Sequence, residues 1–478
     1  MQPKPPRRPV DIVIRQPRQA ELRPLIGEAV AERRPQRILS TSSILILGFV
    51  ALILVGGLLL ALPISSNEGQ FTPLELAFFT ATSAATVTGQ TVVNTSTYWS
   101  TFGQAVIFFL MLVGGLSFMA VATFVLVLIG QSSTIFDSLV MRNAIGVERM
   151  GGLRHIARNI TLVVVFVYLI GAAAILWRIY GMDGMSLNQS VWHSLFLSVS
   201  SFNNAGFSIL PESPSGSGLE RIATEQFLLG FMMALIILGS IGWTVLVDLY
   251  HHGRFARLSL NTKLVLVTSV FLWILGAGVF FLAEFSNTIG DLSPGEKVFS
   301  AVFHSVSGRT AGFATMDFQM AKDFTKLTYP ALMFIGGGAG SVAGGIKVST
   351  FAVIIAAVIS SVRGRPRPEA FGREIASDQV SRALTVAVLG VVFIVVVMPI
   401  LTLTEPNVPF LDLLFETISA FSTNGTSVGI VPDLSLAGKI LLMAAMFIGR
   451  LGPLILALAL APRERAVYRF VEERVTIG

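Results

Sequence analysis

Long apolar runs without charged residues recur along the chain. They cover Ile44–Leu62, Thr101–Gly130, Phe227–Val247, Leu264–Ala283 and Ala383–Thr404. Each run is near or above the roughly 20 residues that a helix needs to cross the hydrocarbon core of a bilayer. A soluble core has no need of so many such runs, so the pattern predicts an all-α polytopic membrane protein.

Four shorter stretches, which mix apolar residues with serine, threonine, asparagine and glycine, lie between apolar runs. They are Phe78–Gly89 (FFTATSAATVTG), Leu195–Gly206 (LFLSVSSFNNAG), Ala301–Gly312 (AVFHSVSGRTAG) and Glu416–Gly425 (ETISAFSTNG). Their closing glycines are 117, 106 and 113 residues apart. This nearly even spacing indicates four copies of one structural unit.

Each mixed stretch is too short and too polar to cross a bilayer alone, so we expect it to enter and leave from one side. Irregular backbone at membrane depth is tolerated where it is buried in protein or lines a water-filled path. We therefore predict four M1-P-M2 repeats (helix, pore loop, helix) around a central pore, with eight membrane spans. The repeats cover residues 43–130, 157–250, 262–362 and 380–462.

The second helix of the third repeat is interrupted by the segment GGGAGSVAGG, residues 336–345, which Lys347 follows closely. Glycine disfavours a helix, and the glycines here are Gly336, Gly337, Gly338, Gly340, Gly344 and Gly345. A nucleotide-binding loop would need a preceding strand and an acidic residue at a set distance, and the sequence has neither. We predict a broken helix that forms a flexible element below the pore loops.

The end of each mixed stretch offers backbone oxygens to a cation. A dehydrated monovalent cation needs several oxygen ligands, and a ring of carbonyl groups supplies them without adding charge. Glycine allows the backbone to turn those carbonyls inward. Each short pore helix would also direct its partially negative carboxyl end to the membrane centre, with Glu75, Glu296 and Asp412 near the outer ends. The expected filter residues are Val87, Thr88, Gly89, Asn204, Ala205, Gly206, Thr310, Ala311, Gly312, Thr423, Asn424 and Gly425.

Composition and charge agree with a membrane location, since 53% of the residues are hydrophobic and 13% are charged. The net charge is +6, and 25 of the 34 lysines and arginines lie in five segments: 1–42, 131–158, 251–263, 363–382 and 463–478. This asymmetry follows the positive-inside rule, so it places both termini in the cytoplasm and does not require nucleic acid as a partner. The chain has no cysteine, which excludes disulfides and thiolate metal sites.

The two terminal segments are expected on the cytoplasmic side. Residues 1–42 form a basic tail that is predicted to be disordered, and residues 463–478 form the cytoplasmic C-terminus. The tail is either a topogenic arm or a docking segment for anionic lipid or a partner. The five histidines have no metal-ligand spacing, and we predict neither a metal cofactor nor catalysis.

Three cationic residues are candidates for a role near the pore. Arg450 interrupts an apolar run, which is costly unless the side chain faces a cavity or a partner. It is predicted to be an electrostatic barrier beneath the filter or a clamp on helix-end carbonyls. Arg309 is expected to lie behind the filter in a structural role, paired with a carboxylate such as Glu416. Lys347 either anchors the glycine-rich segment or extends to the membrane interface.

The motifs SAATVTGQ, SSFNNAGFS, SGRTAGFAT and SAFSTNGTS, together with GGGAGSVAGGIK and FIGRLGPL, resemble the Trk/Ktr/HKT superfamily of potassium transporters. The resemblance extends from about residue 43 to the end and is closest to Ktr-type membrane subunits. It implies potassium uptake across the cell (inner) membrane, with channel-like conduction through a filter of four glycines. Potassium is then the substrate and is bound at the filter.

The same resemblance implies partners and a gate. The protein would be a homodimer in the lipid bilayer, seated on a cytosolic ring of nucleotide-binding regulatory subunits of the KtrA type. The gate would be Gly336–Gly345 together with Arg450. No covalently bound cofactor is implied, and sodium as an activator stays open.

Two positions depart from the family pattern, in which apolar residues are usual: Gln90 after the first filter glycine and Asn424 before the fourth. Either residue could alter the ion preference, so a sodium-permeable or sodium/potassium transporter of the same superfamily is the alternative. A coupled secondary carrier would more often have two halves and acidic residues in mid-span. A membrane enzyme would need a convergent catalytic set, which the sequence does not contain.

Overall fold

The computed structural model describes residues 41–115, 153–180, 184–211 and 219–452, all of which belong to one compact unit spanning Thr41–Gly478. The predictions for the tail 1–42 (apart from its last two residues) and for the C-terminus 463–478 lie outside the described residues. So do the predicted ends of the first and fourth repeats, residues 116–130 and 453–462.

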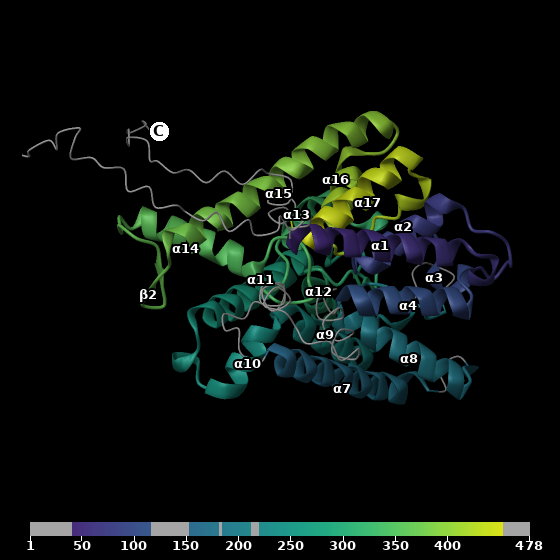
Figure 1. The fold of residues 1–478 in the computed structure, drawn as a ribbon, viewed down its shortest axis with the longest axis horizontal. Coiled ribbons are helices and arrows are strands. Elements are labelled where there is room, and N and C mark those ends of the chain that lie inside the picture. Colours follow the sequence, from purple (N-terminus) through teal and green to yellow (C-terminus); the bar gives the residue numbers. More distant parts are fainter. Residues whose placement is uncertain (1–40, 116–152, 181–183, 212–218, 453–478) are drawn as a thin grey trace, which may run out of the picture. The chain divides into compact units, whose positions relative to one another are not determined.

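The described chain is built almost entirely from helices (Figure 1). The helices are α1 (Thr41–Ala61), α2 (Leu74–Ala85), α3 (Thr95–Tyr98), α4 (Thr101–Gly115), α7 (Leu153–Ile179), α8 (Leu187–Phe202), α9 (Gln226–Ile241), α10 (Trp243–His252), α11 (Leu260–Glu284), α12 (Pro294–Ser307), α13 (Asp323–Phe334), α14 (Val348–Val362), α15 (Ser377–Thr404), α16 (Phe410–Phe421) and α17 (Leu436–Leu451). Strands β1 (Glu369–Ala370) and β2 (Arg373–Glu374) form a small antiparallel hairpin. The predicted all-α class is confirmed.

Several helices are long and apolar enough to cross a membrane. By length and composition these are α7 over Asn159–Ile179, α11 and α15, with α9 and α10 as a fourth candidate if the bent pair makes one span. Shorter apolar helices are α1, α2, α4 and α14. A shorter helix that ends within one of the mixed polar and apolar stretches follows each of α1, α7, α11 and α15.

The apolar run Phe227–Val247 is not one straight helix, contrary to the sequence prediction. Helices α9 and α10 meet at Gly242 with a bend of 95°. Gly242 has a φ of 97°, which a residue with a side chain rarely adopts. A Cβ there would also stand 2.6 Å from the carbonyl oxygen of Ala339 in the glycine-rich segment. The bend therefore makes room for that segment.

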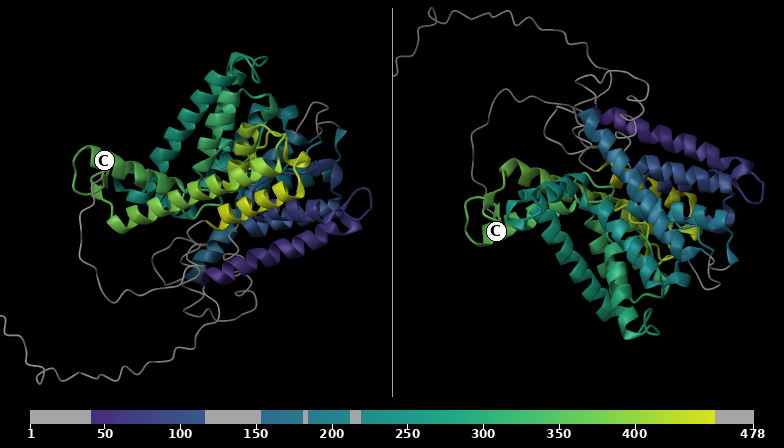
Figure 2. Two further views of the ribbon diagram at one scale, coloured as in Figure 1. Left: turned by 90° about the horizontal axis from the view of Figure 1, so that it is seen from above. Right: turned by 90° about the horizontal axis from the view of Figure 1, so that it is seen from below.

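The short helices α2, α8, α12 and α16 each pack between helices of two different units (Figures 1 and 2). Each contacts the long helix before it: α1 with α2, α7 with α8, α11 with α12, and α15 with α16. Each also contacts the second helix of another unit: α17 with α2, α4 with α8, α9 with α12, and α13 with α16. The second set of contacts joins the first unit to the second, the second to the third, the third to the fourth, and the fourth back to the first.

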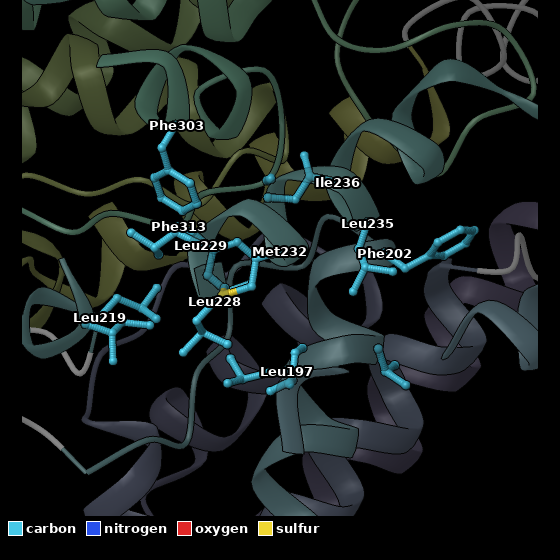
Figure 3. Packing of buried hydrophobic residues seen from close by; sticks show 14 of the residues in the cluster. Leu197, Phe202, Leu219, Leu228, Leu229, Met232, Leu235, Ile236, Phe303 and Phe313 are labelled. Carbon is cyan, nitrogen blue, oxygen red and sulfur yellow. The ribbon is translucent and has the colours of Figure 1, made fainter. Parts of the chain in front are cut away.

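One apolar cluster joins the second and third units (Figure 3). Leu197 of α8, Met232 of α9 and Phe303 of α12 meet there and are fully buried. Phe313, which directly follows the third filter glycine, packs into the same cluster. Burial of this much apolar surface fixes α12 against α9 and so holds the third filter strand in place.

Candidate functional site

The four short helices end in the same way. Each last residue is followed by a cap in right-handed conformation: Thr86, Asn203, Gly308 or Ser422. The filter glycine then lies three residues beyond the cap in the first, second and fourth units and four residues beyond it in the third, where Arg309 is the additional residue. The four helix ends present carbonyl groups without helical partners, which carry partial negative charge.

The predicted filter residues have an unusual backbone. Val87, Asn204, Thr310 and Thr423 have φ values of 57°, 55°, 82° and 49°, and the filter glycines two residues later have φ values of 93°, 70°, 73° and 94°. The residue between each pair does not have a positive φ. Each strand therefore alternates between residues inside and outside the left-handed region. Left-handed conformation is costly for residues with a Cβ, so its recurrence in all four strands points to a functional requirement.

The four strands are packed edge to edge in a closed order. A Cβ on Gly89 would collide with the carbonyl oxygen of Ala205, and one on Gly206 would lie 3.0 Å from that of Ala311. A Cβ on Gly312 would collide with the carbonyl of Asn424, and one on Gly425 with that of Thr88. The structure thus brings all four sets of predicted filter residues together. Glycine is needed at each of the four positions because the neighbouring backbone fills the space of a side chain.

All four filter glycines line one cavity of about 400 Å³. Its lining also includes Asp317 and Glu220. The Asp317 carboxylate accepts a hydrogen bond from the Gln319 N–H at 2.8 Å, so it caps a turn as well as facing the cavity. The cavity is therefore a vestibule that carries acidic groups and opens onto the four strands.

A buried serine in the last turn of each short helix holds the strand that follows. These hydroxyl groups bond to the filter glycine or to the residue after it over 2.6–3.1 Å. These serines were not predicted from the sequence, although a serine near the start of each motif was the available signal. The pairs are Ser83 with Gly89, Ser200 with Phe207, Ser307 with Phe313, and Ser419 with Gly425 and Thr426.

The predicted pairing of Arg309 with Glu416 is wrong. The buried guanidinium of Arg309 donates to the carbonyl oxygens of Gly336 at 2.8 Å and of Ser269 and Ile335 at 3.3 Å. Ile335 and Gly336 directly follow α13, so their carbonyl groups have no partner within that helix, and the arginine satisfies them. Glu416 lies instead on the vestibule side, where it accepts a hydrogen bond from Gln90.

The glycine-rich segment 336–345 is held against the bend between α9 and α10. The N–H groups of Gly338 and Val342 donate to the carbonyls of Ser240 and Gly239 at 2.8 and 3.2 Å. Those carbonyls lie in the last turn of α9, where the helix itself offers no donor. The segment is therefore a folded element and not an open loop.

Two predicted gate cations contact this segment. Arg450 donates to the carbonyl of Val342 and to that of Gly114 at the end of α4. Lys347 donates to the carbonyl of Ala343. Arg450 thus joins the first, third and fourth units at one point, and both cations lie at the segment in the conformation described.

Ion pairs between units lie at the start of the short helices. Lys326 of α13 pairs with Asp412 of α16 at 2.9 Å, and Lys439 of α17 pairs with Glu75 of α2 at 3.8 Å. These lysines were missed by the sequence analysis, which assigned the two acidic residues to the helix dipole alone. The third acidic residue, Glu296, belongs to a capping box, and hydrogen bonds from Ser293 lower its pKa.

Comparisons with known proteins agree with this geometry. A family model described as "TrkH: Cation transport protein" matches residues 30–467. The chain is 36% identical to the Ktr system potassium uptake protein B of Bacillus subtilis, over 91% of this chain and 96% of that protein. It is 33% identical to the potassium/sodium uptake protein NtpJ of Enterococcus hirae, over 94% of this chain and 100% of that protein.

A solved structure with the same fold is the potassium transporter TrkH from Vibrio parahaemolyticus. The TM-score is 0.69, and the match covers 90% of this chain and 87% of that one at 20% sequence identity. At this identity the likeness concerns the fold alone. It agrees with a helical protein that passes through the membrane several times.

Proposed function

The chain belongs to the TrkH family of cation transport proteins, and from this membership we propose that it is the ion-translocating subunit of a potassium uptake system. Potassium passes through the ring of four filter strands in a channel-like way. The closed order of the four glycines around one vestibule is the observation that carries this proposal. The names of relatives that match 91% of this chain support potassium as the transported ion.

The backbone of the filter strands supports carbonyl coordination. A positive φ recurs at every second residue of each strand, and we expect this alternation to turn consecutive carbonyl oxygens toward the ion path. Four strands of this kind supply a set of neutral oxygen ligands in place of the hydration shell of a cation. The helix ends behind them add partial negative charge without a fixed anion in the path.

We further propose eight membrane spans in four units. The spans are α1, α4, α7, the bent pair α9 and α10, α11, the broken pair α13 and α14, α15, and α17. The long apolar helices and the four-fold recurrence of the short helices support this arrangement. The excess of basic residues in the segments between units supports a cytoplasmic location for both termini.

The glycine-rich segment 336–345 is proposed as the gate. Arg450 and Lys347 hold it below the filter strands, because both donate to its carbonyl groups. A cation that leaves the filter would meet two positive charges and a folded segment. Movement of that segment away from α9 would open the path.

The names of the relatives support an assembly of this chain with other subunits. Several of them are components of Ktr systems, so we propose that this chain works with further subunits: a second copy of itself and a cytosolic nucleotide-binding ring. The second candidate function is transport of both sodium and potassium. The name of the Enterococcus hirae relative favours it.

Rubidium uptake by cells that lack their own potassium uptake systems tests the proposal. Expression of the chain is expected to restore uptake, and Gly89→Ser is expected to abolish or strongly reduce it because a Cβ collides with the next strand. Gly230→Ala is the matched control, since a Cβ there would meet one ring atom of Phe299 at 3.9 Å. Uptake that is equal in all three chains would refute the filter.

A further inference from the structure

A buried amide beside the first filter glycine contacts the fourth unit. Gln90 is fully buried, and its Nε2 atom lies 2.5 Å from Oε2 of Glu416 and 3.2 Å from the backbone oxygen of the same residue. Gln90 directly follows Gly89, whereas Glu416 belongs to α16. The contact therefore crosses from the first unit to the fourth.

The other oxygen of the same carboxylate holds the fourth strand. Glu416 Oε1 accepts hydrogen bonds from Ser427 Oγ at 2.5 Å and from the Val428 N–H at 2.8 Å. Glu416 is 1% exposed, and no cation pairs with it among the described residues. A buried carboxylate needs such donors, so its position and those of the donors depend on one another. Glu416 thereby ties the outer ends of the first and fourth strands together.

Asn424 fastens the same strand on its other side. Its Nδ2 atom donates to the carbonyl oxygen of Gly308 in the third unit at 2.7 Å, and its Oδ1 accepts from Thr426 Oγ1 at 2.7 Å. Asn424 has no exposed surface. The two residues that depart from the family pattern thus point away from the ion path and join the fourth strand to both neighbouring units.

We propose that Gln90, Glu416 and Asn424 are positioning residues that fix the width of the filter and thereby its preference for potassium over sodium. The inference rests on the proposed function. Sodium is the smaller ion, and coordinating it requires carbonyl oxygens to move inward. The fourth strand cannot move inward without breaking hydrogen bonds to the first and third units. The polar residues at these two positions therefore strengthen the discrimination between the ions.

Gln90→Leu tests this directly, with the sodium-to-potassium permeability ratio measured from reversal potentials in reconstituted bilayers. The sodium-to-potassium permeability ratio is expected to rise about tenfold. A change of this size follows if part of the free energy of one hydrogen bond to a charged group no longer contributes to the discrimination. Asn424→Val is expected to raise the ratio in the same direction. Gln104→Leu is the matched control, because Gln104 accepts from Trp192 Nε1 at 3.0 Å between the first and second units but does not contact a filter strand.

A charge exchange separates positioning from a general loss of stability. Gln90→Glu alone places two carboxylates in contact and is expected to raise the ratio further. The double variant Gln90→Glu/Glu416→Gln restores one amide and one carboxylate in contact, while the amide oxygen at position 416 can still accept from Ser427 and Val428. We expect it to return the ratio toward that of the wild type. Side-chain size is nearly unchanged in these two variants, so they still test the positioning role if Gln90→Leu fails to fold.

The outcomes distinguish this inference from the proposed function. If the wild type prefers potassium and both Gln90→Leu and Asn424→Val keep its permeability ratio, the positioning role is overturned while the function stands. An equal rise of the ratio in Gln104→Leu would also overturn it, because any contact between units would then suffice. If the wild type carries no cation, the proposed function fails and this inference fails with it.

Discussion

Arg450 contacts backbone carbonyl groups of two different units. It donates to Val342 in the glycine-rich segment and to Gly114 at the end of α4. These contacts agree with the predicted clamp on helix-end carbonyls, whereas the barrier beneath the filter stays a proposal. The two hydrogen bonds hold the segment in the conformation described.

Replacement of Arg450 by alanine is expected to raise cation flux. The variant loses one positive charge below the filter and two hydrogen bonds that hold the segment in place. Arg178→Ala is the control, since that arginine pairs with Glu225 at the end of α7, away from the segment. Flux into proteoliposomes measures the effect, with the amount of folded protein checked by size-exclusion chromatography. Flux equal to that of the wild type would contradict the barrier.

The candidate filter glycines could be predicted from the sequence, whereas most of the residues that hold their strands in place could not. Gly89, Gly206, Gly312 and Gly425 carry a signal because the same glycine recurs at even spacing. The sequence contains no signal for the partners of Arg309. They are backbone carbonyl groups in α11 and at the end of α13, and any residue type can supply a backbone carbonyl. A carboxylate such as Glu416 looked like the natural partner by charge alone, which the structure contradicts.

Among the elements, the break in the third unit was visible in its glycines, whereas the bend between α9 and α10 was not. A single Gly242 within an apolar run is compatible with a continuous helix. The bend depends on the segment 336–345, whose N–H groups satisfy the carbonyls at the end of α9. This tertiary contact between distant segments overrides the local preference of the sequence.

Deletion of residues 338–343 is expected to raise flux because it removes both the obstacle and the acceptors of Arg450 and Lys347. Potassium and rubidium flux should increase together, since the filter strands are unchanged. Deletion of residues 370–372, at the turn of the β1–β2 hairpin, is the control and should leave flux unchanged. A gate-segment deletion that is inert in a folded protein would remove the case for gating.

The ion pairs between units are expected to stabilise the fold more than they affect transport. Lys326→Met leaves Asp412 largely buried without its partner and should cost roughly 1–3 kcal/mol, between the values for exposed and buried pairs. Lys439→Met should cost less, because the distance to Glu75 is longer and that carboxylate is more exposed. Thermal unfolding of the detergent-solubilised protein measures both. A larger loss of stability in Lys439→Met than in Lys326→Met would argue against these relative contributions of the two ion pairs.

For the whole molecule, the absence of cysteine allows a clean test of topology. Glu68→Cys lies in the exposed segment between α1 and α2 and is expected to react with a membrane-impermeant maleimide from outside intact cells. Arg373→Cys, in the exposed hairpin between the third and fourth units, should react only after the membrane is opened. Labelling of both sites from the same side would contradict the proposed eight spans.

The closed order of the four units explains why the proposed filter needs all four of them. Each second helix packs against the short helix of the next unit, and the fourth unit returns to the first. The four strands then meet at one vestibule, although their glycines lie more than 100 residues apart along the chain.

The most direct measurement is cation flux into proteoliposomes of the purified chain, with potassium, rubidium, sodium and lithium gradients compared in parallel. We predict flux of potassium and rubidium well above that of sodium and lithium, and loss of this preference in Gly89→Ser. Equal flux of sodium and potassium in the wild type would contradict a potassium-selective filter of four glycines and would favour transport of both ions.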